Sequence, residues 1–185
     1  MRLKTPRLAP LEREEWDEET AAVVEPFANN KGDVFNIFKT LAHHPDLLRR
    51  WRVFANHVLG KSTLNERDRE LLILRIGYLC NAEYEWAQHV AIGRRVGITD
   101  SEIADLKAGS SAQNWSERDR LLLKAAEELH DDAFISDATW DGLSKHYNKQ
   151  QLIDIVFTVG QYNMVSMALN TLGVQLDKGL RGFDG

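Results

Sequence analysis

Apolar residues recur along most of the chain at the three- and four-residue spacing that places them on one face of an α-helix. Phe35, Phe38 and Leu41 share one such face, and similar runs follow through the rest of the chain. No segment shows the sustained apolar–polar alternation of a half-buried strand bounded by turn residues. The pattern therefore predicts an all-α protein, a bundle of helices joined by short loops.

Residues that favour helix ends divide this pattern into elements. Asn65 and Ser116 are expected N-caps, and Thr99 forms a capping box with Glu102 three residues later. Asn81 is expected to cap the helix that follows it. The helices predicted in this way span residues 12–24, 34–42, 45–59, 66–79, 82–96, 100–108, 117–129, 137–147 and about 151–176.

The two ends of the chain differ in character. The last predicted helix is apolar on nearly all sides, and such a helix lies in the middle of a protein or at a contact between subunits. Near the start, Pro6 and Pro10 indicate an extended segment. We therefore divide the chain into an N-terminal arm, residues 1–12, and a single all-helical domain, residues 13–185.

The composition fits one folded domain. The 185 residues are 43% apolar and 28% charged, which is the profile of a globular protein. The net charge of −5 argues against nucleic acid as a partner. We interpret the basic run Arg49-Arg50-Trp51-Arg52 as a solvated helix face.

Cysteine content and hydropathy bear on the compartment. Cys80 is the only cysteine, so no disulfide can form within the chain, which fits a cytoplasmic protein. The first residues lack the apolar core of a signal peptide. No run of about 18 apolar residues occurs, so we expect no membrane as a partner.

The segment around His89 holds the residues that could carry chemistry. Glu85 and His89 lie four residues apart, one turn from each other on the same helical face. A carboxylate beside an imidazole is a usable acid–base pair, because the ring titrates near neutral pH. The same spacing occurs on many solvated helices, so the pair alone leaves a structural role open. No H-x-x-x-H or H-E-x-x-H spacing is present, and we expect no metal site.

Three motifs surround this segment. They are Arg67-x-Arg69-Glu70-Leu71, the helix of His89, and Gly97-Ile98-Thr99 leading to Ser101-Glu102-Ile103. Together they resemble the carboxymuconolactone decarboxylase / AhpD-like family. The resemblance implies an AhpD-like helical bundle that forms a homo-oligomer, a trimer or a hexamer.

The residues at the family's reactive positions indicate which branch the chain resembles. A peroxidase of this family needs a thiolate and a resolving thiol within reach, and the two matching positions here hold Ala82 and Glu85. The pattern Glu83-x-Glu85-x-x-x-His89 instead resembles the decarboxylase branch. This resemblance implies a carboxy-lyase-like enzyme that needs no cofactor, with Glu70, Glu85 and His89 as catalytic residues.

Loss of CO₂ would leave a carbanion that a neighbouring carbonyl takes up as an enolate. His89 can then act as donor and acid, oriented by Glu85 and linked to Glu70 in a relay. The expected substrate-binding residues are Tyr84, Trp86, Tyr162 and Arg75. Arg75 would balance a substrate carboxylate, although a structural ion pair would explain it equally well.

Three functions stay open at this stage. The first is a lyase, decarboxylase or isomerase that acts on a small aromatic-derived acid or lactone, as in aromatic compound catabolism. The second is an AhpD-like peroxidase or antioxidant protein, which would need Cys80 to line the same pocket with a lowered pKa. The third is a non-catalytic binding protein on the same scaffold. We favour the first, with a small molecule and further copies of the chain as partners.

Overall fold

The computed structural model describes residues 1–183 and confirms that this part of the chain is all-helical, without strands. Residues 184 and 185 of the predicted domain lie outside the described residues. The α-helices are α1 (Glu18–Val24), α2 (Asn36–Leu41), α3 (Pro45–Gly60), α4 (Glu66–Leu79), α5 (Glu83–Arg95), α6 (Asp100–Ala108), α7 (Glu117–Asp132), α8 (Asp137–Ser144) and α9 (Lys149–Leu172). Three 3₁₀ turns cover Arg13–Glu15, Glu25–Phe27 and Gly109–Ser111.

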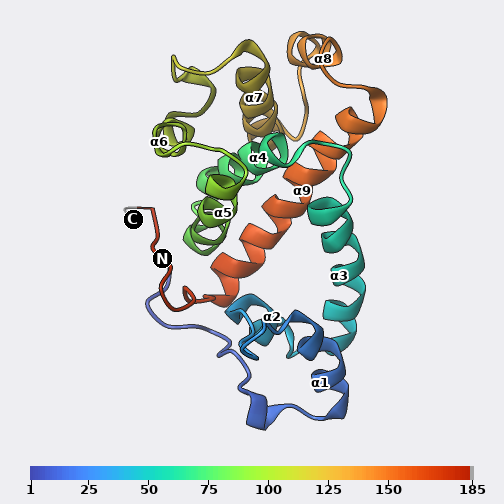
Figure 1. The fold of residues 1–185 in the computed structure, drawn as a ribbon, viewed down its shortest axis with the longest axis vertical. Coiled ribbons are helices and arrows are strands. Elements are labelled where there is room, and N and C mark those ends of the chain that lie inside the picture. The colour runs from blue at the N-terminus through green and yellow to red at the C-terminus, as the bar shows by residue number, and fades with distance from the viewer. Residues whose placement is uncertain (184–185) are drawn as a thin grey trace.

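Helix α4 forms the centre of the main core, where it packs against α5, α7 and α9. Because neighbours surround it, α4 is apolar on several faces, and the run from Leu71 to Leu74 is fully buried. The long helix α9 runs obliquely through the molecule beside α3, α4 and α5 (Figure 1). Helices α1 and α2 lie with one end of α3, while α6, α7 and α8 lie at the opposite end of the molecule (Figure 1).

Local capping explains most of the helix starts. The side chain of Asn65 accepts a hydrogen bond from the backbone of Asp68, and Thr99 and Glu102 form the expected capping box. Ser116, Ser136 and Asn148 likewise cap α7, α8 and α9. These side chains satisfy backbone N–H groups that have no partner inside the helix.

Several predicted boundaries were wrong. Asn81 does not cap α5: its φ of 51° is left-handed, and it ends α4 instead, where asparagine tolerates this conformation. The first helix begins only at Glu18, because Asp17 caps it. Helix α9 ends at Leu172 and not at 176, because Gly173 adopts a left-handed conformation there. Helix α8 ends at Ser144 and not at 147.

Helix α9 has two apolar faces, which differ in their exposure. One face is buried in the core, and the other exposes Ile153, Phe157, Met164 and Met167. Among residues 1–183 it is the one helix that is long and apolar enough to cross a membrane, with a mean hydropathy of 1.3 over its best window. Half of that window is buried inside the protein.

The N-terminal arm packs along the end of α9. The backbone N–H groups of Arg7 and Leu8 both donate to the carbonyl of Leu172, at 2.8 and 3.3 Å. Further along the arm, the backbone of Leu11 bonds to Lys39 in α2. The arm therefore joins the end of α9 to α2.

Candidate functional site

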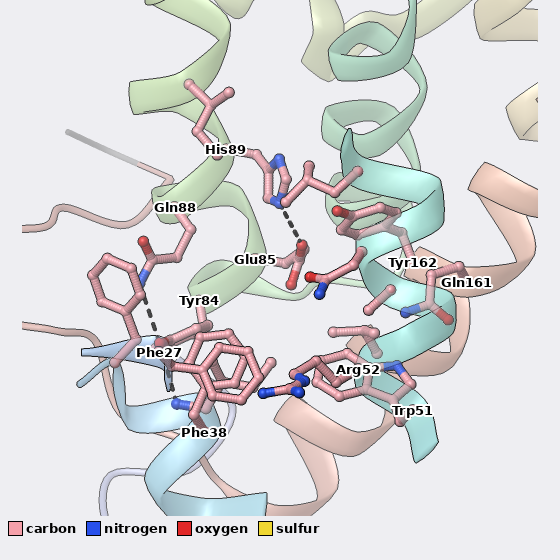
Figure 2. Close-up of a pocket in the computed structure, with 17 residues that line it drawn as sticks. Phe27, Phe38, Trp51, Arg52, Tyr84, Glu85, Gln88, His89, Gln161 and Tyr162 are labelled. Atoms are coloured by element: carbon pink, nitrogen blue, oxygen red, sulfur yellow. Dashed lines mark hydrogen bonds and ion pairs between the residues drawn. The ribbon is translucent and has the colours of Figure 1, made fainter. Parts of the chain in front are cut away.

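A cavity of about 180 Å³ lies between α2, α3, α5 and α9. Its walls are largely aromatic, and include Phe27, Phe38, Trp51, Tyr84 and Tyr162. The polar side chains that line it include Arg52 and Asn56 from α3, Glu85, Gln88 and His89 from α5, and Gln161 from α9. Figure 2 shows His89 and Glu85 at one end of this cavity and Arg52 at the other.

The imidazole of His89 is held between two carboxylates. Its Nδ1 lies 2.6 Å from Glu70 Oε2, and its Nε2 lies 3.0 Å from Glu85 Oε1. Glu70 comes from α4 and is fully buried behind the ring, whereas Glu85 comes from α5 and lines the cavity. Arg69 donates two hydrogen bonds of 3.3 Å to the other oxygen of Glu70. The three residues predicted to be catalytic therefore lie together, although their catalytic role stays a prediction.

These contacts determine the charge of the ring. Burial lowers the pKa of His89, but the charges of Glu70 and Glu85 outweigh this effect and raise it from 6.5 to about 10. His89 is therefore an imidazolium at neutral pH and donates a hydrogen bond to each carboxylate. Within residues 1–183, Glu85 Oε2 accepts no hydrogen bond. Glu85 is thus a lining residue of the cavity with one carboxylate oxygen that the described residues do not engage.

Two residues of α9 complete this end of the cavity. Tyr162 packs edge-on against His89, with ring centroids 5.0 Å apart. Burial, followed by the charges of Glu85 and Glu70, raises the pKa of Tyr162 well above its ordinary value, so its hydroxyl stays a neutral donor. The amide nitrogen of Gln161 is turned toward the cavity (Figure 2).

Tyr84 lines the cavity with its ring, but its hydroxyl serves the fold. It donates a 2.5 Å hydrogen bond to Asp177 and accepts one from the backbone of Ile37. Gln88 donates to the same Asp177 oxygen at 2.6 Å. Burial and the neighbouring Asp177 raise the pKa of Tyr84 strongly, so it stays neutral. The predicted role in substrate binding is thus limited to the face of its ring.

Arg75 and Trp86 do not line the cavity, which corrects the prediction for both residues. Arg75 lies five residues after Glu70, about 140° around α4. There its guanidinium pairs with Glu127 at 2.9 Å and donates to the carbonyl of Leu106. Trp86 follows Glu85 directly and therefore points into the core on another face of α5.

Arg52 provides the positive charge that was predicted for Arg75. It lines the cavity from α3, and its guanidinium lies 5.6 Å from the ring centroid of Phe27. No carboxylate pairs with it in the part of the chain that the structure describes. The basic run was predicted to be a solvated face, which holds for Arg49 but not for Arg52. The overlooked signal was its place one turn after the buried Leu48.

Cys80 lies outside the cavity. Its thiol is partly buried and contacts the side-chain oxygen of Asn163 at 3.0 Å. Burial raises its pKa, so less of it is thiolate at neutral pH. The two conditions set for a one-cysteine peroxidase, a place in the same pocket and a lowered pKa, are therefore not met.

Comparison with known proteins agrees with the motifs of the sequence. Residues 45–128 match the model of the carboxymuconolactone decarboxylase family. The uncharacterized protein YdfG of Bacillus subtilis (strain 168) is 24% identical to this chain over 114 residues. That match covers 59% of this chain and 78% of YdfG.

Solved structures share the fold. A peroxidase-related protein of Ralstonia eutropha JMP134 with an alkylhydroperoxidase AhpD core has a TM-score of 0.81 at 19% identity, over 94% of this chain and 93% of that one. A variant of the debrominase Bmp8 in complex with 2,3,4-tribromopyrrole has a TM-score of 0.77 at 15% identity, over 95% and 94%. At these identities the likeness confirms an AhpD-like helical fold and does not transfer an activity.

Proposed function

We propose that this chain is a member of the carboxymuconolactone decarboxylase / AhpD-like family and a cofactor-independent lyase or isomerase that acts on a small organic acid through Glu85 and His89. The observation that carries the proposal is the imidazole ring of His89, held between two carboxylates at the wall of a cavity. A surface pair of the same residue types would be solvated, whereas both members of this one are buried.

The opposite end of the cavity supports an acid as the substrate. Arg52 has no carboxylate partner within residues 1–183, and a guanidinium binds carboxylates well. The aromatic walls favour a planar, mostly apolar body for the ligand. The related fold of the debrominase Bmp8 binds a small heteroaromatic ring, 2,3,4-tribromopyrrole, which agrees with this ligand class.

The geometry suggests a division of roles. Both nitrogens of His89 are occupied by carboxylates, so the group that reaches the ligand is the free oxygen of Glu85. In an isomerisation, Glu85 takes a proton from the carbon next to a carbonyl and returns it at another position. In a decarboxylation, the C–C bond breaks, CO₂ leaves, and its electron pair forms an enolate. The enolate carbon then receives a proton that Nε2–H of His89 supplies through the carboxylate of Glu85, which leaves His89 as a neutral imidazole until solvent returns the proton.

Arg52 is best suited to a group that does not react. An ion pair with a departing carboxylate would stabilise the ground state and slow the loss of CO₂. A second acidic group bound at Arg52 would instead place the reacting carbon near Glu85. Tyr162 and the amide nitrogen of Gln161 are then the donors for the oxygen that becomes negative.

The test compares acid–base chemistry with thiol chemistry. We expect turnover of one or more members of a panel of lactones, keto acids and aromatic acids, followed by CO₂ release and by NMR for isomerisation. Cys80→Ser should keep this turnover within about twofold, because Cys80 lies outside the cavity. Turnover of peroxide that disappears in Cys80→Ser would contradict the proposal. Binding of panel members without turnover would support the non-catalytic alternative.

We also propose that the chain forms a homo-oligomer through the exposed face of α9. Ile153, Phe157, Gly160, Met164 and Met167 follow one another at alternating spacings of four and three residues. This spacing is typical of a seam between packed helices, and the glycine in the middle lets another backbone approach closely.

Light scattering after size-exclusion chromatography tests the assembly. We expect a trimer or hexamer for the unaltered chain and smaller species for Phe157→Glu, because a carboxylate would be buried without a partner. Phe134→Glu is the matched control, since Phe134 is equally exposed but lies between α7 and α8. A monomeric unaltered chain, or the same loss of assembly in both variants, would contradict this assignment.

A further inference from the structure

A second cavity, of about 220 Å³, adjoins the one that contains Glu85 and His89. The two cavities share Ile37, Trp51 and Val165 in their walls. Apart from Trp51, every side chain that lines the second cavity is aliphatic or a methionine. The second cavity therefore offers a ligand apolar contact and no charge.

The difference in polarity between the cavities is large. The first cavity holds an anion–cation cluster at one end and Arg52 at the other, whereas the second holds no ionisable side chain. A cavity lined almost entirely by apolar groups binds apolar molecules of matching size.

We propose that the substrate has two parts: a planar acidic head in the first cavity and a hydrocarbon tail in the second. The inference rests on the proposed function for the head, and it adds the tail as a determinant of specificity. Trp51 lies between the two parts, with its ring against the ligand on both sides. Its Nε1 is buried and has no hydrogen-bond partner within residues 1–183.

A ligand tail explains the second cavity better than a second copy of the chain does. Leu47 and Met164, at the edge of the cavity, are about half exposed, so a neighbouring copy could reach them. The inner part, formed by Leu48 and Leu169, is fully or nearly fully buried and continues toward Glu85 through the shared walls. A narrow hydrocarbon chain that passes along those shared walls would contact both cavities.

Binding of three probes separates the two cavities. Benzoate carries the head alone, butylbenzene lacks the acid, and 4-butylbenzoate combines the head with a tail. Their affinities are measured by isothermal titration calorimetry for the unaltered chain, Ala168→Phe, Leu172→Trp and Arg52→Gln. Ala168 and Leu172 line the second cavity but not the first, so the larger side chains should fill it. Two filling variants guard against the loss of one to misfolding.

The expected gain from the tail is large, since each buried methylene strengthens binding by roughly fourfold. We expect 4-butylbenzoate to bind the unaltered chain about 50- to 250-fold more tightly than benzoate does. Filling the second cavity should reduce this ratio to below about threefold and leave the affinity for benzoate unchanged. Arg52→Gln should weaken both acids by about tenfold and preserve their ratio.

The outcomes distinguish the tail from the proposed function. Equal affinities of benzoate and 4-butylbenzoate, or a gain that persists in both filling variants, would overturn the tail. The tail would also be overturned if the butyl group gave no gain in affinity for the unaltered chain while Ala168→Phe changed the assembly state. That result would assign the second cavity to a contact between subunits. If benzoate binding did not depend on Arg52, the acidic head of the proposed function would fail. The tail would still be supported if butylbenzene bound the unaltered chain and did not bind the two variants in which the second cavity is filled.

Discussion

Glu85→Gln is expected to lower kcat by roughly 10²- to 10⁴-fold, the usual contribution of a positioned acid–base group. Glu85 lines the cavity, and its Oε2 is the oxygen that no described residue binds. Glutamine has the same shape and can still accept the hydrogen bond from His89 Nε2, but it cannot take up or return a proton. The value of KM should change much less than kcat, because Arg52 and the aromatic walls remain.

Glu83→Gln is the matched control for this substitution. It makes the same chemical change two residues earlier on α5, where the carboxylate pairs with the chain's N-terminal amine and does not line the cavity. We expect its kcat to stay within about threefold of the unaltered chain. An equal loss in both variants would point to damage to α5. Full activity of Glu85→Gln would remove Glu85 from the mechanism.

The residues around His89 could be predicted from the sequence because their placement is local. A spacing of four residues puts Glu85 and His89 on one helical face, whatever the rest of the fold does. Glu70 joins them because α4 and α5 are consecutive helices that pack against each other. The resemblance to a family then indicated that this face points inward.

Arg52 could not be predicted in the same way, because its position depends on tertiary structure. It lies on α3, which forms part of the cavity wall by packing against α2 and against α9, the latter far away in the sequence. Arg75, the residue chosen instead, was selected for its closeness in sequence to Glu70. Closeness along one helix does not determine which of its faces a neighbouring helix covers. Arg75 lies on the face of α4 that α7 covers, where it bonds to Glu127.

The fold shows the same division between local and tertiary information. Helix starts at Asn65 and Thr99 were correct because the capping side chain and its partner lie within four residues. Asn81 was assigned to the wrong role because asparagine favours both an N-cap and a left-handed helix end. Only the backbone, with φ at 51°, distinguishes the two.

Glu70→Gln is expected to destabilise the protein by about 3–5 kcal/mol at pH 7, because it removes one partner of a buried ion pair. Glu70 is fully buried and is shared by Arg69 and His89, so the change leaves two buried cations with too little counter-charge. Glu25→Gln makes the same change in the exposed pair with Arg13. That control should cost no more than about 1 kcal/mol. Urea unfolding measures both.

The pH dependence of the free energy of unfolding tests whether the charge on His89 contributes to this stability. Its pKa is raised in the folded chain, from 6.5 to about 10, so the folded state holds an extra proton between these values. The resulting stabilisation is complete below about pH 6.5 and is lost as the pH rises through about 10. Relative to His89→Gln, which lacks this proton, the unaltered chain should lose about 1.4 kcal/mol per pH unit between pH 7.5 and 9.

Glu70→Gln should lower the upper limit of the pH range over which stability falls, because that limit is the pKa of His89 in the folded chain. Without the Glu70 charge, the pKa of His89 falls toward its ordinary value, and the loss of stability is complete at a lower pH. Urea midpoints from pH 6 to 10 for the unaltered chain, Glu70→Gln and His89→Gln measure this shift. Parallel curves for the unaltered chain and His89→Gln would mean that the ring is neutral at pH 7. His89 could then accept a proton itself, and the roles of Glu85 and His89 would be reversed.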